Sequence, residues 1–434
     1  MTRPKGRVFS IPPSAPFLKT LAAALVDGRL VEGFSLDRDD PLSLARATIY
    51  VPTRRAARVL RSEFVDLLGG RSAILPVIRP LGETDDDAGY FDEIDDGDLD
   101  LLPPVTPVTR LVELAKLILL WRNRLPDMLR DIHSDSPLVA PASPADAIWL
   151  AKSLAELIDA VETEDTGWTG LETIDLGDRA LWWQLTGEFL KIASAYWPIR
   201  LAELNRSSPS LHRNDAIGAE ARRIARQDPS HPMIVAGSTG SIPATAALIA
   251  AIHGLERGAV VLPGLDFQMN EADWRMAGAI AADGRRNTDP ASRSHPQYGL
   301  FHLLQKLKTI REDVVPLALE HGEMQVRAMA VSVAFTPAEA DVNPLAWRES
   351  IGEARVEEAF SGLALIEAAN ERSEALAIAI ALKLALHAPG ADERTQVALV
   401  TPDRTLARRV TAELQRFGIE ADDSAGTPLS SSLH

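Results

Sequence analysis

The stretch that most constrains the fold runs from His231 to Asp266 and contains two short apolar segments, Met233–Ala236 and Ala259–Leu262. Between them lies a segment rich in Ala, Leu and Ile, Ala244–His253, whose composition predicts a helix. Two strands joined by a helix of about ten residues pair in parallel through a right-handed crossover. The stretch therefore predicts an α/β fold with a parallel sheet at its centre.

A small polar turn follows the first of these predicted strands. Its sequence is Gly237-Ser238-Thr239-Gly240-Ser241, and it lies where a strand leads into a helix. Ligands of open α/β sheets bind at the carboxyl ends of the strands, so Ser238 and Thr239 are candidate ligand contacts, and the ligand proposed for them below is a nucleic-acid strand. Further strands and helices of this domain are predicted at Val8–Ile11, Phe17–Val26, Thr48–Val51, Arg54–Leu68 and Tyr298–Ile310.

The middle of the chain, from Pro107 to Ala225, has apolar residues at helical spacing almost throughout. Its helices are predicted at Leu111–Arg124, Pro144–Glu162 and Arg179–Asn205. Six of the eight tryptophans lie here and are predicted to anchor a core, namely Trp121, Trp149, Trp168, Trp182, Trp183 and Trp197.

The C-terminal part is predicted to contain two strands and two helices. The strands are Leu363–Glu367 and Val397–Thr401, and the helices are Glu371–His387, with Asn370 as its N-cap, and Arg404–Phe417. Two strands and two helices bury too little surface for an independent sheet domain. This part is therefore expected to begin a second α/β domain of a longer protein. Packing on the first domain as a small appendage is the alternative.

The formal net charge of −16 disfavours a simple basic surface that binds nucleic acid. Ten acidic and no basic residues lie in Glu83–Asp100, so −6 of the total of −16 belongs to the remaining sequence. This acidic stretch is expected to be a solvated loop. A calcium loop is the alternative, but the Gly and Glu positions of an EF-hand are missing.

Several classes of site are disfavoured by composition. The chain has no cysteine, which excludes disulfides, thiol catalysis, iron–sulfur ligation and cysteine zinc sites within it and fits a reducing compartment. The nine histidines show no metal-ligand spacing, so no metal site is predicted. No signal peptide and no run of eighteen apolar residues is found, so no membrane association is expected.

The segment Pro52–Leu60, with sequence PTRRAARVL, directly follows a predicted strand and resembles motif Ia of superfamily 1 helicases. A Thr at a strand end and the first amides of a helix can bind phosphate. Arg54 and Arg55 add the positive charge that a single-strand path requires. Thr53, Arg54 and Arg55 are therefore candidate nucleic-acid contacts. An ordinary amphipathic helix with a basic solvent face is the alternative.

A degenerate nucleotide-binding loop follows the first predicted strand. Lys19 and Thr20 occupy the last two positions of the pattern G-x-x-x-x-G-K-S/T, but Pro13 and Leu18 replace its glycines. Such a loop needs glycine and backbone amides to bind phosphate, and three prolines among residues 12–16 remove amide donors. No strand ends in the Asp-Glu pair of a Walker B motif. A working nucleotide hydrolase is therefore disfavoured.

Taken in order, these features resemble the AddB family, the second large subunit of the bacterial AddAB helicase–nuclease, in its alphaproteobacterial form. The resemblance is carried by VFSIPPSAPFLKTLA, YVPTRRAARVLRSEF, VAGSTGS and DDSAGTPL. Leu365–Ala375 also resembles the opening of the second RecA-like domain of superfamily 1. The resemblance spans essentially the whole chain and covers the N-terminal, helicase-like part of the family protein.

The resemblance implies a fold class and a domain organisation. Residues 1–103 and 226–335 would form an inactivated RecA-like α/β domain of the P-loop fold, like that of superfamily 1 helicases. Residues 104–225 would form an all-helical insertion, and 361–434 would begin a second RecA-like domain. The nuclease domain of the family, with its iron–sulfur cysteines, is absent from this sequence.

The resemblance also implies a function. The family complex uses ATP to process double-strand DNA ends for recombination, and the helicase-like part of AddB scans single-stranded DNA for the hotspot sequence Chi. The partner, an AddA-type subunit in a heterodimer, would use ATP and Mg²⁺, and this chain would hold no cofactor. A cytoplasmic, nucleoid-associated location would follow. The alternative is a structural scaffold that only binds the partner, and clustering of Arg54 and Arg55 with Ser238–Ser241 at one sheet edge would distinguish DNA binding from it.

Overall fold

The computed structural model describes residues 7–81, 101–123, 143–168, 170, 180–227, 230–280, 286, 293–336, 346–390 and 395–423. The chain divides into two compact units, Met1–Glu353 and Ala354–His434. The predicted acidic loop Glu83–Asp100 and most of the DDSAGTPL segment lie outside the described residues.

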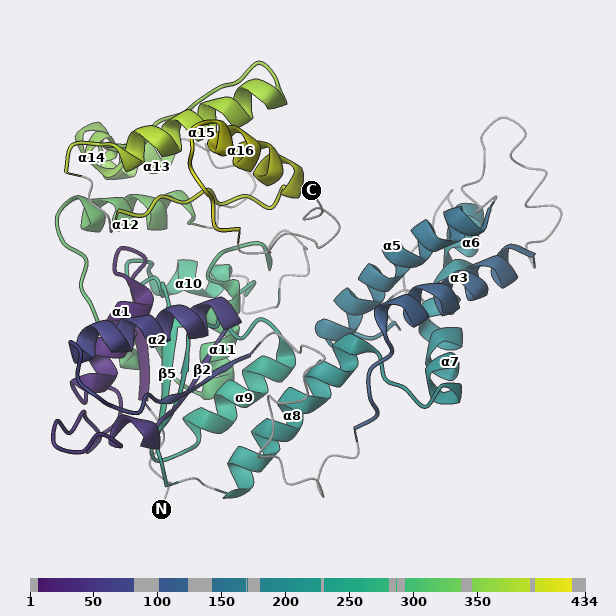
Figure 1. Cartoon of the computed structure of the whole chain (residues 1–434), viewed down its shortest axis with the longest axis horizontal. Coiled ribbons are helices and arrows are strands. Elements are labelled where there is room, and N and C mark those ends of the chain that lie inside the picture. The colour runs from purple at the N-terminus through teal and green to yellow at the C-terminus, as the bar shows by residue number, and fades with distance from the viewer. Residues whose placement is uncertain are drawn as a thin grey trace. The chain divides into compact units, whose positions relative to one another are not determined.

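The first unit contains a six-stranded parallel sheet, which lies among α1 (Phe17–Val26), α2 (Arg54–Leu68), α9 (Pro243–His253) and α11 (Tyr298–Leu307), as Figure 1 shows. Its order is β3-β2-β4-β5-β1-β6, and every pairing is parallel. The strands are β1 (Arg7–Ile11), β2 (Thr48–Val51), β3 (Val77–Pro80), β4 (Met233–Ala236), β5 (Gly258–Pro263) and β6 (Val315–Pro316). The predicted α/β class is confirmed, and the sheet is compatible with a RecA-like fold. β3 and β6 were not predicted.

Both faces of the sheet are buried, as the nearly continuous apolar sequences of its strands require. Successive side chains of a strand point to opposite faces. On β2, Ile49 and Val51 therefore join one core, whereas Tyr50 joins the other. The first core also contains α1 (Phe17–Val26) and α2 (Arg54–Leu68). The second contains α8 (Pro209–Gln227), α9 (Pro243–His253), α10 (Glu271–Ala277) and α11 (Tyr298–Leu307).

The helices between β3 and α8 have a core of their own. Among the described residues they are α3 (Pro107–Asn123), α5 (Pro144–Thr163), α6 (Ala180–Lys191), a π-helical turn (Ile192–Tyr196) and α7 (Trp197–Glu203). Trp197 is fully buried in this core, and Trp121 and Trp168 are partly buried against it. The prediction of a core position is wrong for Trp149, whose side chain is 71% exposed. The side chains of Trp182 and Trp183 lie outside the described residues.

A buried polar cluster joins α8 to the sheet. Glu220 on α8 is 1% exposed, and its Oε1 accepts a 2.6 Å hydrogen bond from the Tyr50 hydroxyl of β2. Arg223 and Arg79 also donate to this carboxylate, Arg223 Nε to Oε2 at 2.7 Å and Arg79 Nη1 to Oε1 at 3.3 Å. Burial raises the pKa of Glu220, but the hydrogen bonds from Arg223 and Tyr50 outweigh burial, so the pKa lies below its ordinary value. Burial and the Glu220 charge raise the pKa of Tyr50.

The first unit ends with α12 (Glu323–Ala334) and α13 (Ala346–Ile351), and α14 (Glu353–Ala359) begins at the boundary. In the second unit, α15 (Glu371–Leu386) and α16 (Arg404–Arg416) pack together around Ala375, Ala379, Val410 and Leu414. The predicted strands Leu363–Glu367 and Val397–Thr401 do not form. Within the part of the chain that the structure describes, neither segment has a strand to pair with.

Candidate nucleic-acid interface

The sheet brings the five predicted contact residues to one edge. β2 and β4 are neighbours, with Thr48 opposite Met233 and Tyr50 opposite Val235. Because the strands are parallel, the loops that follow them lie side by side. A Cβ placed on Gly237 would lie 3.3 Å from Cδ of Pro52, so the two loops are in contact.

On the β2 side, Thr53 is the N-cap of α2, and its Oγ1 accepts a 3.1 Å hydrogen bond from the amide of Ala56. The hydroxyl therefore stabilises the helix start as an acceptor, and Thr53 is exposed, so its own O–H proton remains available to donate to a phosphate. Arg55 is exposed and Arg54 is half-buried in the first turn of the same helix. The positive end of the helix dipole thus lies at the sheet edge, and Arg54 and Arg55 lie in the turn that forms it. The Nε and Nη2 atoms of Arg54 are buried.

On the β4 side, the turn has a fixed conformation. Gly237 and Gly240 have φ values of 81° and 63°, which favour glycine. The amide of Gly240 donates to Oγ of Ser238 at 3.2 Å, and a Cβ on Gly240 would lie 2.9 Å from Cδ1 of Leu303. Ser238 and Thr239 are half-buried in this turn. They therefore offer a pre-formed polar surface beside the arginines.

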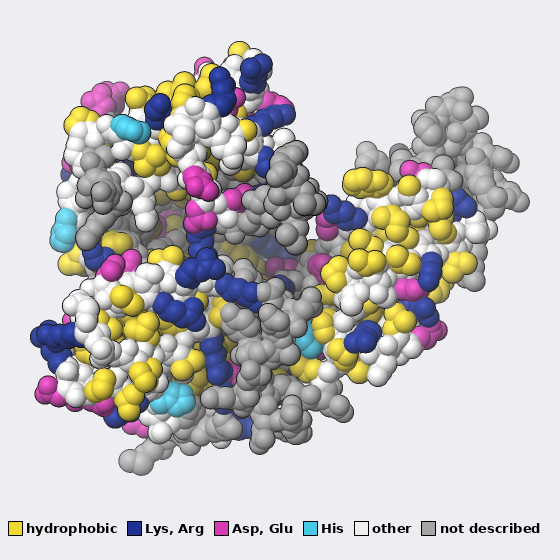
Figure 2. Space-filling model, viewed as in Figure 1, with side chains coloured by type: hydrophobic (Ala, Val, Ile, Leu, Met, Phe, Trp, Pro, Cys, Tyr) yellow, Lys and Arg dark blue, Asp and Glu magenta, His cyan; other side chains and the backbone are white. Residues whose placement is uncertain are grey.

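Two further helices begin at this edge without a side-chain cap. The N-cap positions of α1 and α9 are Pro16 and Ile242, and neither side chain accepts a hydrogen bond from the helix. Helix N-termini favour anions. Exposed basic side chains lie on α1 and α2, namely Lys19, Arg55, Arg58 and Arg61. Figure 2 shows Lys and Arg side chains gathered over this region of the first unit.

The degenerate loop after β1 has a different geometry from a phosphate-binding loop. The amide of Ala15 donates to the carbonyl of Pro12 at 3.1 Å, which closes a tight turn before α1. Leu18 packs on the core, whereas Lys19 is exposed. The amide of Thr20 donates to the carbonyl of Pro16 within the first helical turn. The loop therefore lacks the glycine turn of a phosphate-binding loop, and its backbone amides are those of an ordinary helix start.

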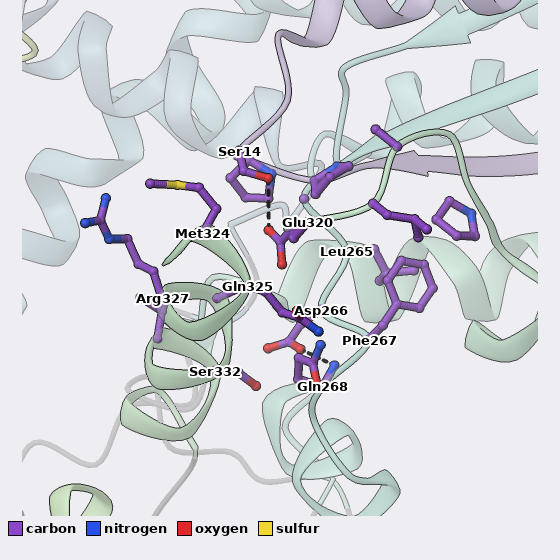
Figure 3. Close-up of a pocket in the computed structure, with 18 of the residues that line it drawn as sticks. Ser14, Leu265, Asp266, Phe267, Gln268, Glu320, Met324, Gln325, Arg327 and Ser332 are labelled. Atoms are coloured by element: carbon purple, nitrogen blue, oxygen red, sulfur yellow. Dashed lines mark hydrogen bonds between the residues drawn. The ribbon is translucent and has the colours of Figure 1, made fainter. Parts of the chain in front are cut away.

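The sequence interpretation missed a pocket at the other end of the edge, beyond the ends of β1, β5 and β6. Its volume is about 710 Å³, and its lining includes the carboxylates of Asp266 and Glu320 (Figure 3). Asp266 lies in the loop after a predicted strand, so its position at the sheet edge was available from sequence. Glu320 follows the two-residue strand β6, which leaves no periodic signal.

Comparison with known proteins finds no protein-family model that matches the chain and no match among curated proteins. In the described ranges, no three His, Asp or Glu side chains group together so as to hold a metal ion. The helices of these ranges are all too short or too polar to cross a membrane.

Proposed function

We propose that the chain is an inactivated helicase-like region that binds single-stranded DNA across the carboxyl ends of β2 and β4. One observation carries this proposal: the neighbouring strands bring Arg54 and Arg55 next to the Ser238–Ser241 turn. A strand lying across both loops would have its phosphates near the start of α2 and the polar turn. Contacts of this kind position the backbone and carry little sequence information.

The wider proposal follows from the motifs. Three motifs follow one another in the order of the AddB family. They are the degenerate loop after β1, the PTRRAARVL segment after β2 and the polar turn after β4. We therefore propose that the first unit is RecA-like, and that an AddA-type partner supplies ATP hydrolysis in a heterodimer that processes DNA ends. No catalytic residue is assigned to this chain.

A scaffold role is the second candidate, and exposed apolar side chains of the helical segment favour it. Val108 and Leu120 of α3, Trp149 of α5 and Ile199 of α7 are between 55% and 73% exposed. Exposed apolar side chains concentrated in one segment are typical of protein interaction surfaces. This segment would bind the partner subunit, and the two roles can coexist on separate parts of the first unit.

The DNA-binding proposal is tested by fluorescence anisotropy with a labelled single-stranded oligonucleotide over a series of salt concentrations. The double substitution Arg54→Ala and Arg55→Ala should flatten the slope of log K against log salt by up to about 1.4, at roughly 0.7 per lost phosphate contact. Binding by the parent should weaken steeply with salt and depend little on sequence.

The matched control removes the same charge at the opposite, amino-terminal edge of the sheet. Arg46 precedes β2 and Arg257 precedes β5, so Arg46→Ala with Arg257→Ala should leave the slope near that of the parent. Equal slopes for the parent and the Arg54 and Arg55 variant would contradict the proposed strand path. If both double variants flatten the slope of log K against log salt equally, the effect would come from the change in net charge and would not locate the strand path.

A further inference from the structure

The pocket beyond β1, β5 and β6 is built from parts far apart in the sequence. The degenerate loop contributes Pro12–Ser14, the loop after β5 contributes Gly264–Gln268, and the segment from Pro316 into α12 closes it. Its volume of about 710 Å³ lies in the range of small-molecule sites. Apolar walls come from Pro13, Phe267 and Met324, among others. Such a concave, mostly apolar pocket with a few polar groups is the usual form of a ligand site.

Hydrogen bonds hold the loop after β5 in place. Oδ1 of Asp266 accepts from the amides of Gln268 and Met269 at 2.7 and 3.1 Å, which fixes the carboxylate. The side chain of Gln297 bridges the loop, because its Nε2 donates to Gly264 O at 3.0 Å and its Oε1 accepts from the Asp266 amide at 3.2 Å. The site is therefore pre-formed, which lowers the entropic cost of binding.

The ionisable side chains that line the pocket are the carboxylates of Asp266 and Glu320, the imidazole of His321 and the guanidinium of Arg327. Oε1 of Glu320 accepts a 3.3 Å hydrogen bond from the Ser14 hydroxyl, and Glu320 and Asp266 both lie toward the centre of Figure 3. Neither carboxylate forms an ion pair with any residue that the structure describes. The guanidinium of Arg327, on α12, is directed away from both. Burial raises the pKa of Glu320, the Ser14 hydrogen bond lowers it, and the charge of Asp266 raises it further, so the pKa lies above its ordinary value.

This electrostatic pattern selects among ligands. Phosphates would be repelled by the two carboxylates, although the pocket borders the loop where a P-loop protein holds them. A cation would gain charge-assisted hydrogen bonds and would relieve the repulsion between the carboxylates. An apolar frame on that cation would cover the apolar walls, and Phe267, 43% exposed, offers an aromatic face.

We infer that this pocket binds a small organic amine carried on an aromatic or apolar frame, with Glu320 and Asp266 holding the ammonium group. This inference is independent of the strand path proposed for β2 and β4. The loops of the pocket fix the carboxylates in advance, while α12 supplies the wall opposite Phe267.

Three ligands with the same indole frame test the inference by isothermal titration calorimetry on the full chain. Tryptamine carries an ammonium, tryptophol a hydroxyl and indole-3-acetate a carboxylate. Tryptamine should bind saturably and about tenfold more tightly than tryptophol, as a charge-assisted hydrogen bond predicts. Indole-3-acetate should bind most weakly. N-acetyl-lysinamide, which stands for a basic side chain of a protein partner, should bind more weakly than tryptamine because it lacks the aromatic frame.

The variant Glu320→Gln keeps the shape and the acceptor for Ser14 but removes the charge. It should reduce the preference for tryptamine over tryptophol from about tenfold to about threefold, because Asp266 keeps its charge. The matched control is Glu256→Gln, an exposed glutamate next to the amino-terminal end of β5, which should leave the preference unchanged. Circular dichroism verifies that both variants are folded.

Three results would overturn the inference. One is equal affinity of the folded parent for the three indole ligands. Another is an unchanged preference in folded Glu320→Gln. The third is tighter binding of ATP or N-acetyl-lysinamide than of tryptamine, since either would assign the pocket to another ligand class. If Glu320→Gln does not fold, the order of the affinities of the parent protein for the three indole ligands still tests the inference.

Discussion

The two units contain similar sequence patterns but differ in what those patterns become. In the first unit, Met233–Ala236 is a strand between two parallel neighbours, and all four of its residues are buried. In the second, Leu363–Glu367 is equally apolar in its first residues but does not pair, and Leu365 is 87% exposed. The helices predicted for both units form, and further short helices that were not predicted, such as α10 and α13, form beside them. Helical hydrogen bonds are local, whereas a strand needs a partner.

The largest expected difference between the units is in the loss of unfolding free energy when a proline is substituted into each of these two segments. Val235→Pro in β4 removes a ladder hydrogen bond between two neighbouring strands and should lower the free energy of unfolding by about 4 kcal/mol or more. Leu365→Pro should change it by less than about 0.5 kcal/mol, because no described strand pairs there. Urea unfolding measures both.

The natural probes separate the two units in this experiment. All eight tryptophans lie before residue 354, so tryptophan fluorescence reports the first unit and far-ultraviolet circular dichroism reports both. A large loss for Leu365→Pro in either signal would mean that Leu363–Glu367 is paired in solution, and the contrast between the units would fail.

A smaller effect is expected from the buried cluster that joins α8 to the sheet. Glu220→Gln should lower the free energy of unfolding by about 2–4 kcal/mol, because two arginines lose their buried anion. Tyr50→Phe should lower it by about 1 kcal/mol. The second unit has no comparable buried pair among its described residues. The part of the circular dichroism transition that tryptophan fluorescence does not follow should therefore be unaffected.

The same cluster gives a pH dependence with a definite sign. The folded pKa of Glu220 is depressed, so its stabilisation is present above the ordinary glutamate pKa of about 4.3 and is lost as the pH falls through the folded value. Fluorescence-detected unfolding between pH 7 and pH 3 should therefore show a smaller acid loss for Glu220→Gln than for the parent. An identical pH profile would contradict the assigned role of Glu220.

The sequence could predict the structural features that depend on residues close together in the chain. The main strands β1, β2, β4 and β5, the helices α1, α2 and α9 and the loops at the ends of β2 and β4 were readable from sequence, so Arg54 and Ser238 could be expected at one edge. The helix α10 that follows β5 was not predicted. Contacts between distant residues could not be read this way. Tyr50 and Glu220 are separated by 170 residues, and Ser14 and Glu320 by 306. The exposure of Trp149 likewise depends on how α5 packs, which helical spacing alone does not determine.

The smallest difference between the units is expected for helix caps. Removal of an N-cap should cost about the same stability in each unit. Thr53 caps α2 through the Ala56 amide, and Asn370 caps α15 through the Ser373 amide at 2.9 Å. Because a cap acts within one turn, Thr53→Ala and Asn370→Ala should each cost about 1 kcal/mol. Fluorescence measures the first loss and circular dichroism the second. Thr53→Ser and Asn370→Asp keep the capping oxygen and should restore most of the stability. If only Thr53→Ala lowers the stability, the cap at Asn370 does not contribute measurably to the stability of α15, and the expected similarity of the two units would be contradicted.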